Sequence, residues 1–231
     1  MKNIIIPILL IVGISSRVYA QLPEVKKGAQ TWMTYNLNVD KFRNGDIIPE
    51  VKSKEDWEKA CKEKKPAWCY YNNDAVIGNE FGKLYNLYAI SDPRGLAPIG
   101  WHVATDEEWT ALIKNLGNEQ YEIVEKFTEV ASFTDDGKMV LGFNGKPGGA
   151  RILGRESRAV ISKGAGGVDG TFWGMEDINK HGSWWTSSVF STQKGGPTDV
   201  FWCRSFATNS DNFNRHSGNY TDGMYVRCVK D

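Results

Sequence analysis

The clearest pattern of polar and apolar positions lies between residues 105 and 117. Thr105, followed three residues later by Glu108, has the arrangement of a capping box, in which each side chain accepts a hydrogen bond from the other residue's backbone N–H group. Apolar residues then recur at helical spacing, at Trp109, Leu112, Ile113 and Leu116. Gly117 supplies a stop signal. The pattern therefore predicts a helix from Asp106 to Leu116.

Two more helices are predicted from their caps and from the spacing of their apolar residues. The first runs from Lys54 to Lys64 after Ser53, and the second from Glu119 to Glu129 after Asn118, a cap candidate. The positions expected to face the core are Trp57, Ala60 and Cys61 in the first helix, and Ile123, Val124 and Phe127 in the second. The charged remainder of the first helix is interpreted as a solvated face.

From Phe133 onward the apolar residues no longer recur at helical spacing. Clustered glycines between residues 142 and 170 disfavour an extended helix, and short aromatic runs follow them. These runs predict strands at Ser183–Val189, Val200–Phe206 and Met224–Val229. The stretch from Gly142 to Gly182 is predicted to be a long loop with short ordered pieces. Helices early and strands late agree with an α+β fold.

The first twenty residues have the features of a cleaved signal peptide. A positive start is followed by an apolar run from Ile4 to Val12, and the cut is expected after Ala20. The alternative, a membrane anchor, needs about 20 apolar residues. The apolar run here is about half that length, so cleavage is the favoured interpretation. We therefore expect an exported protein in the periplasm, at the outer-membrane surface or outside the cell. We also expect a short tail over residues 21–29 and one domain over residues 30–231.

Composition narrows the classes of partner. The 231 residues include 28 basic and 28 acidic side chains, so their formal net charge of zero offers nucleic-acid binding no electrostatic support. No apolar run after the opening segment is long enough to cross a bilayer. The chain also has 9 Trp, 9 Tyr and 10 Phe residues, which suit a frame whose loops are packed down by large flat side chains.

Four cysteines remain after the expected cleavage, at Cys61, Cys69, Cys203 and Cys228. Export favours disulfides, and we prefer the pairs Cys61–Cys69 and Cys203–Cys228 because each closes a short loop. The spacing alone does not exclude a disulfide between Cys69 and Cys228. A zinc site is the competing interpretation, but there is no C-x-x-C spacing and the three histidines are scattered.

The residues give little support to catalysis. Ser187 and Ser188 lack a G-x-S-x-G turn, and no histidine is spaced to activate them. The acidic pairs at 107–108 and 135–136 are interpreted as a helix start and a turn, although carboxylates distant in sequence could still meet in space. The paired glycines at 148–149 and 166–167 lack the Lys-Ser/Thr of a phosphate loop. His102 is interpreted as a hydrogen-bonded structural residue.

Two features are candidates for ligand binding. Oxygen-bearing side chains cluster between the last two predicted strands, and calcium and sugar hydroxyls both favour such groups. These side chains are Asn209, Asp211, Asn212, Asn214, Asn219 and Asp222. We favour the alternative, a solvated hairpin loop built from turn residues. The second feature is a set of aromatic residues that could stack on sugar rings: Trp173, Trp184, Trp185, Phe201 and Trp202.

From these features we select Asp211, Asn212, Asn214, Trp184 and Trp185 as candidate ligand-binding residues. Consecutive residues in a strand point to opposite faces, so at least one of Trp184 and Trp185 is expected in the core. We expect no cofactor and no resident metal, with calcium as the one open alternative.

Several short blocks occur in order along the chain. They are Gln30–Met33 with Asn36–Asn38, Pro66–Asn73, Gly82–Asn86, Gly100–Val103, Thr105–Trp109, Trp184–Ser188 and Val226–Asp231. Together they resemble the Fibrobacter succinogenes major paralogous domain family, found mostly in exported proteins of Bacteroidetes and related bacteria and without an established common activity. A more distant similarity is to the formylglycine-generating sulfatase-modifying group. Both resemblances imply a C-type-lectin-like α+β fold, with a few helices on a small twisted antiparallel sheet and long loops on one side.

The chain also departs from these relatives. Ala97-Pro98 stands where family members often have Cys-Pro, and Cys61 and Cys203 lie where most members are not expected to have cysteine, so the disulfide pattern is expected to be local to this protein. The sulfatase-modifying enzymes use a closely spaced reactive cysteine pair, whereas no cysteine follows Cys203 before Cys228. This departure argues against that enzymatic activity.

The resulting hypothesis is an exported, non-enzymatic binding or interaction module at the bacterial cell envelope or surface. It would contact a protein or a glycan through its loop face. The first alternative is an accessory subunit of an outer-membrane or surface complex. The second is an uncharacterised carbohydrate-active enzyme, which would need two titratable groups that converge in a cleft.

Overall fold

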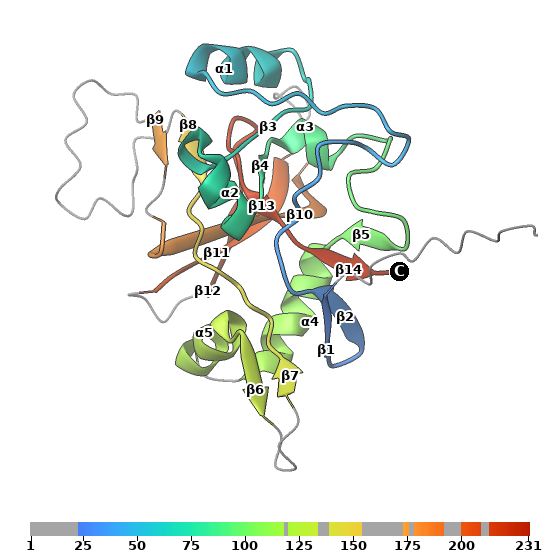
Figure 1. The fold of residues 1–231 in the computed structure, drawn as a ribbon, viewed down its shortest axis with the longest axis vertical. Coiled ribbons are helices and arrows are strands. Elements are labelled where there is room, and N and C mark those ends of the chain that lie inside the picture. Colours follow the sequence, from blue (N-terminus) through green and yellow to red (C-terminus); the bar gives the residue numbers. More distant parts are fainter. Residues whose placement is uncertain are drawn as a thin grey trace, which may run out of the picture.

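The computed structural model describes residues 23–117, 120–133, 139–153, 173–175, 178–191, 200–208 and 213–231. In these residues the chain is an α+β protein whose helices flank several small sheets (Figure 1). Helices α1 (Lys54–Lys62), α2 (Ala75–Phe81) and α3 (Leu87–Ile90) lie toward one end, and α4 (Asp106–Leu116) and α5 (Gln120–Thr128) toward the other. A short 3-10 helix, η1 (Tyr71–Asn73), precedes α2.

The first sheet joins the beginning of the described chain to its end. Its strand order is β1 (Glu24–Lys27), β2 (Gln30–Met33), β14 (Cys228–Lys230) and β5 (Trp101–Val103), and neighbouring strands are antiparallel. Residues 24–27, which the sequence analysis placed in a short tail, thus form an edge strand. Their pairing with β2 extends the sheet by one strand.

The second sheet has the order β12 (Phe213–Ser217), β11 (Val200–Ala207), β10 (His181–Ser191) and β13 (Tyr225–Val226). Its strands are antiparallel except for β13, which runs parallel to β10. Three two-stranded pairs complete the description: β3 (Trp68–Cys69) with β4 (Leu84–Tyr85), β6 (Ala131–Phe133) with β7 (Met139–Leu141), and β8 (Arg151–Leu153) with β9 (Trp173–Met175).

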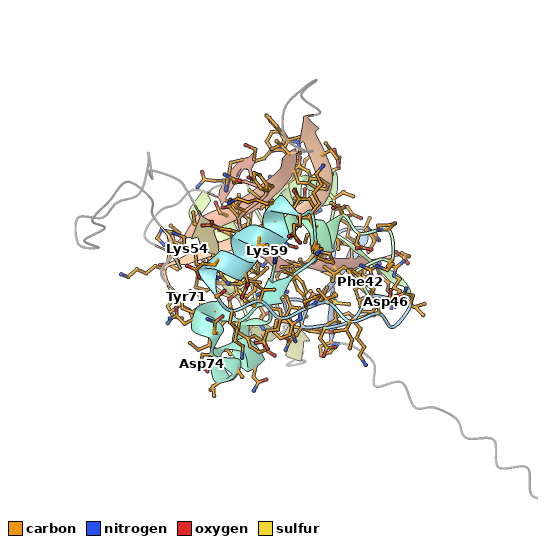
Figure 2. All side chains as sticks on the ribbon, turned by 90° about the horizontal axis from the view of Figure 1, so that it is seen from above. Phe42, Asp46, Lys54, Lys59, Tyr71 and Asp74 are labelled. Carbon is orange, nitrogen blue, oxygen red and sulfur yellow. The ribbon has the colours of Figure 1, made fainter. Side chains whose placement is uncertain are left out.

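The core consists of two clusters of buried side chains, and adjacent residues of β10 belong to different clusters. Trp184 packs in the first, where its ring is parallel to that of Phe206 with centroids 5.8 Å apart, while Trp185 packs in the second. Helix α1 covers one end of the molecule, where Figure 2 labels its residues Lys54 and Lys59. Its Trp57 is buried and donates a hydrogen bond to the Thr221 carbonyl at 2.8 Å. Both faces of β10 are therefore covered at Trp184 and Trp185.

The predicted helices are confirmed, with small changes at their ends. α4 has the bounds given by its capping box, and α5 spans Gln120–Thr128, while its cap candidate Asn118 lies outside the described residues. α1 ends two residues early, because Lys64 adopts a positive φ of 55°. The Lys65 N–H then bonds the Ala60 carbonyl at 2.8 Å, as in a Schellman motif.

The predicted strands are also found, except that Met224–Val229 is divided into β13 and β14. The break falls at Arg227, whose guanidinium is buried and donates to the carbonyls of Met33, Phe143 and Asn144 and to the Asn36 side chain. Within the expected loop 142–182, the described residues include β8 and β9. None of the helices in the described part of the chain has the length and apolar character that a bilayer crossing requires.

Candidate functional site at the start of helix α4

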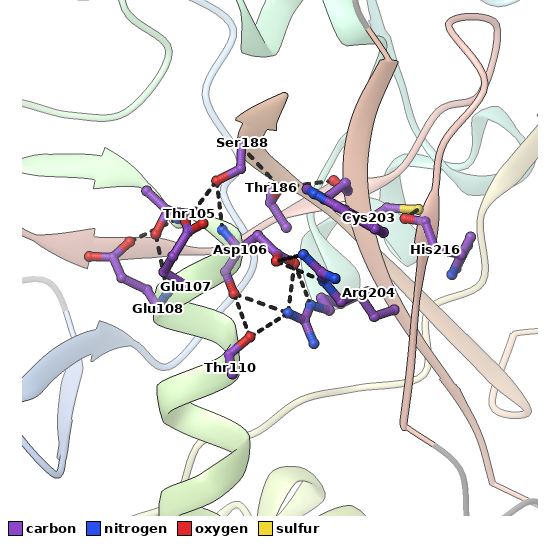
Figure 3. Close-up of polar contacts among 12 residues, drawn as sticks. Thr105, Asp106, Glu107, Glu108, Thr110, Thr186, Ser188, Cys203, Arg204 and His216 are labelled. Carbon is purple, nitrogen blue, oxygen red and sulfur yellow. Dashed lines mark hydrogen bonds and ion pairs between the residues drawn. The ribbon is translucent and has the colours of Figure 1, made fainter. Parts of the chain in front are cut away.

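The first turn of α4 faces the β10–β11–β12 sheet and is held there by reciprocal hydrogen bonds. Thr105 Oγ1 accepts from the Glu108 N–H group at 3.1 Å, and Glu108 Oε2 accepts from the Thr105 N–H group at 2.8 Å. Ser188 of β10 accepts from the Asp106 N–H group at 2.9 Å and donates to the Glu107 carboxylate at 3.1 Å (Figure 3). The capping box thereby fixes where Asp106 meets the sheet.

Asp106 is the centre of a buried charge cluster. Its side chain is 3% exposed, and its Oδ1 atom accepts from Arg204 Nη2 at 2.6 Å and Nε at 2.9 Å. Its Oδ2 atom lies 2.6 Å from Nη2 of Arg215. Arg204 Nη2 also donates to Thr110 Oγ1 at 2.7 Å, as Figure 3 shows. The carboxylate therefore joins α4 to both β11 and β12.

The strand register explains why this carboxylate is needed. Arg204 of β11 lies directly opposite Arg215 of β12. Like charges at opposite positions of an antiparallel pair repel each other, and Asp106 lies between the two guanidinium groups and binds both. Burial lowers the pKa of Arg204, whereas the hydrogen bond to Asp106 raises the pKa of the exposed Arg215.

Next to this cluster lies a group of partly exposed side chains that we call the edge cluster: Phe190, Trp202 and Arg215. The Arg215 guanidinium lies over the Trp202 ring, 3.5 Å from its centroid. The Phe190 ring is perpendicular to the Trp202 ring, with centroids 4.4 Å apart. Phe190 is 47% exposed, and the Arg215 side chain is 46% exposed. The edge cluster thus presents apolar and cationic surface beside a buried ion pair.

Two of the predicted ligand-binding residues are corrected by their burial. Trp184 and Trp185 are both fully buried, and their indole N–H groups donate to Asn36 Oδ1 at 2.8 Å and to the Tyr85 carbonyl at 2.9 Å. Neither ring can stack on a sugar, because core side chains cover both faces of β10 at these two positions. Phe201 is buried as well, while Trp202 is partly exposed.

The polar candidates are only partly described. Asp211 and Asn212 lie outside the described residues, as does Asn209, whereas Asn214 is exposed on β12. Asn219 and Asp222 form a turn, in which Asp222 Oδ2 accepts from the Asn219 N–H group at 2.9 Å. Within the described ranges, no three His, Cys, Asp or Glu side chains are grouped so as to hold a metal ion.

All four cysteines are buried thiols, and neither preferred disulfide is present in the structure. Cys61 accepts a hydrogen bond from Asn86 at 3.8 Å, and Cys203 donates one to the His216 carbonyl at 3.2 Å. Burial raises the pKa of Cys61 to about 11 and that of Cys228 to about 12. The thiolate forms of these two residues, which are the reactive forms, are therefore rare at neutral pH.

Sequence reasoning missed Asp106, Arg204 and Arg215. Asp106 was assigned only to a helix start, and its partners are 98 and 109 residues away along the chain. One local signal was available: Arg204 occurs inside a strand between Cys203 and Phe206, where a buried charge requires a counter-charge. That signal predicts a partner without saying which acid provides it.

The fold and this site define an α+β domain with an aromatic core and a surface site fixed by a buried ion pair. The chain matches the family described as the Fibrobacter succinogenes major domain over residues 25–230. It therefore belongs to that family, as its sequence blocks indicated. No curated protein and no solved structure matches the chain.

Proposed function

We propose that the protein is an exported, non-enzymatic binding module of the bacterial cell envelope, and that it contacts another protein through the edge cluster. The observation that supports this most directly is the exposure of Phe190, nearly one half, beside Trp202 and Arg215. Export is inferred from the signal-peptide pattern of residues 1–20.

The residue types of the edge cluster suit a protein interface. Trp and Arg are enriched among the residues that dominate binding energy at interfaces, and aromatic residues are enriched there in general. Arg215 is held by the buried Asp106 and by the Trp202 ring, so its position is set before any partner arrives. A fixed side chain loses less conformational entropy on binding than a mobile one.

A protein partner fits the edge cluster better than a glycan. Sugars stack on an open aromatic face, but the Arg215 guanidinium covers one face of Trp202 and the Phe190 ring packs perpendicular to it. The apolar surface that remains is the exposed part of Phe190. This surface favours an apolar side chain of a protein over a polar sugar ring.

Two observations favour binding over bond-breaking chemistry at this site. Both oxygens of the Asp106 carboxylate are bound by guanidinium groups, which hold it as an ion-paired structural group rather than as a base. The Cys203 thiol behind it is buried and donates to a backbone carbonyl. We also propose that the α+β frame is C-type-lectin-like, supported by helices packed around small antiparallel sheets and by the pairing of β2 with β14.

The test is recovery of partners by the full chain from membranes in mild detergent, followed by identification of the co-purifying proteins. Phe190→Ser is expected to lose a partner that the wild type retains. Ile99→Ser is the matched control, because Ile99 is 86% exposed and lies outside the edge cluster. Stoichiometric recovery in one complex would make the protein an accessory subunit. Equal recovery by both variants, or binding on a glycan array with no protein partner, would contradict the proposal.

A further inference from the structure

His102 bridges two carboxylates that come from different elements. Its Nε2 atom lies 2.8 Å from Glu108 Oε1, in the first turn of α4, and its Nδ1 atom lies 2.8 Å from Asp231 Oδ1, in the residue after β14. His102 itself is in β5 and pairs with Val229 of β14. Its expected role as a hydrogen-bonded structural residue is confirmed by these contacts.

The geometry determines the protonation state in which both contacts are favourable. An ionised carboxylate only accepts hydrogen bonds, and neutral imidazole has a single N–H group. A neutral His102 could therefore donate to Glu108 or to Asp231, but not to both. Imidazolium has two N–H groups and satisfies both carboxylates, while its charge offsets one of theirs.

The other charged groups nearby are engaged elsewhere. On α4, Glu107 accepts from Ser188, and Asp106 is bound by its two arginines. On β14, Lys230 lies over the Trp101 ring and pairs with Glu24 of β1 at 2.9 Å. Among the described residues, the charged groups hydrogen-bonded to the imidazole are thus Glu108 and Asp231.

We propose that Glu108, His102 and Asp231 form a pH-sensitive clip that fastens the end of β14 to the first turn of α4 while the imidazole is protonated. Loss of the proton to solvent removes one of the two N–H donors and leaves one carboxylate facing a ring lone pair. The Asp231 N–H group also donates to the Gly100 carbonyl at 3.1 Å. When the clip opens, the Asp231 side chain is released while this backbone hydrogen bond is kept.

The three residues do not form a metal site. The two carboxylates contact opposite ring nitrogens, so they cannot converge on an ion bound to one of them. The direction of the pKa shift agrees with the clip: partial burial lowers the pKa of His102, but the hydrogen bonds to Asp231 and Glu108 outweigh it and the pKa is raised.

The direct test is an NMR titration of the histidine ring signals in the full chain between pH 5 and 9. The midpoint of His102 is expected above the value of about 6.5 for an unperturbed histidine, and it should fall in Glu108→Gln and in Asp231→Asn. Glutamine at residue 108 is compatible with a capping box, so α4 keeps its start. The signals of His181 and His216 serve as internal references.

A second measurement follows the unfolding midpoint of the wild type and His102→Gln across the same pH range. A raised folded pKa gives stability that is complete below the unfolded pKa and lost as pH rises through the folded pKa. The advantage of the wild type should therefore be largest near pH 5 and shrink at higher pH. A midpoint of His102 at or below that of an unfolded histidine, or one unmoved by both carboxylate replacements, would overturn the proposal.

Discussion

Asp106 and Arg204 form a buried ion pair whose Oδ1 and Nη2 atoms are 2.6 Å apart, although they lie 98 residues apart along the chain. The pair fixes the first turn of α4 against the middle of β11. Arg215 binds the second carboxylate oxygen from the neighbouring strand. One acidic side chain thus connects a helix with two strands. It also positions Arg215, the charged member of the edge cluster.

Replacement of Asp106 by Asn should destabilise the protein strongly. The change leaves the Arg204 guanidinium buried opposite Arg215 without a counter-charge, and breaking a buried ion pair from one side costs about 3–5 kcal/mol. The measurement is urea unfolding followed by tryptophan fluorescence. Glu107→Gln is the matched control, because among the described side chains Glu107 accepts a hydrogen bond from the Ser188 hydroxyl and from neither arginine. A loss below about 1 kcal/mol would mean that the pair is not buried in solution.

Replacing both partners should cost less than the sum of the two single changes. Asp106→Leu with Arg204→Met removes both charges together, so neither is left unpaired in the core. The coupling between the two positions is expected to lie within about 0.5–3 kcal/mol, the range typical of residues in direct contact. Additive losses in a double-mutant cycle would show that the two side chains act independently.

Trp184 and Trp202 should respond in opposite ways to truncation. Trp184 is enclosed by core rings, including Phe127 at 5.3 Å and Phe206 at 5.8 Å between centroids, so Trp184→Ala should lose about 3–5 kcal/mol of stability. Trp202 is partly exposed, and Trp202→Ala should lose less stability but weaken partner recovery. The paired measurements are denaturant unfolding and co-purification. A stable Trp184→Ala protein would contradict the core assignment.

The thiols should be unreactive in the folded protein when it is prepared under reducing conditions. Burial raises the pKa of Cys61 to about 11 and that of Cys228 to about 12, so alkylation by iodoacetamide at pH 8 should be slow. In urea all four should react, as mass spectrometry would count. The predicted disulfides have a separate test. Protein is recovered from an oxidising compartment and alkylated in urea without reductant, and cysteines that form disulfides should then stay unmodified. Rapid modification of the folded thiols would show that the core opens readily.

How much of this could be predicted depended on the range of the interaction. The bounds of α4 followed from the sequence because Thr105, Glu108 and Gly117 act on their own neighbours. Strand alternation correctly placed Trp184 and Trp185 on opposite faces, but it could not say that both faces are covered. The contact between Asp106 and Arg204 depends on the path of the chain between two residues that lie 98 positions apart, and no local pattern specifies that path.

Arg227 provides the last prediction, since it divides the final predicted strand and is buried, with no ion pair to an acidic side chain within the residues that the structure describes. Its guanidinium donates to three backbone carbonyls, those of Met33, Phe143 and Asn144, and to Asn36 Oδ1. Arg227→Lys keeps the charge, but a single ammonium group cannot reach acceptors arranged around a planar fork. Each buried acceptor left unpaired costs about 1–3 kcal/mol of stability. Arg227→Lys leaves at least one acceptor unpaired, so it should lose at least about 1 kcal/mol.

Asn36→Ala is the comparison for Arg227→Lys: it leaves the carbonyl contacts of the guanidinium in place, but it removes the shared acceptor of Arg227 and the Trp184 indole and the donor to the Phe81 carbonyl. Both variants should therefore be less stable than the wild type in urea. In Arg227→Lys, hydrogen exchange should be faster than in the wild type at the Leu37 N–H group, which donates to the Val226 carbonyl at 2.8 Å beside the break. If Arg227→Lys were as stable as the wild type, the break between β13 and β14 would have to be held by the flanking strand pairs alone.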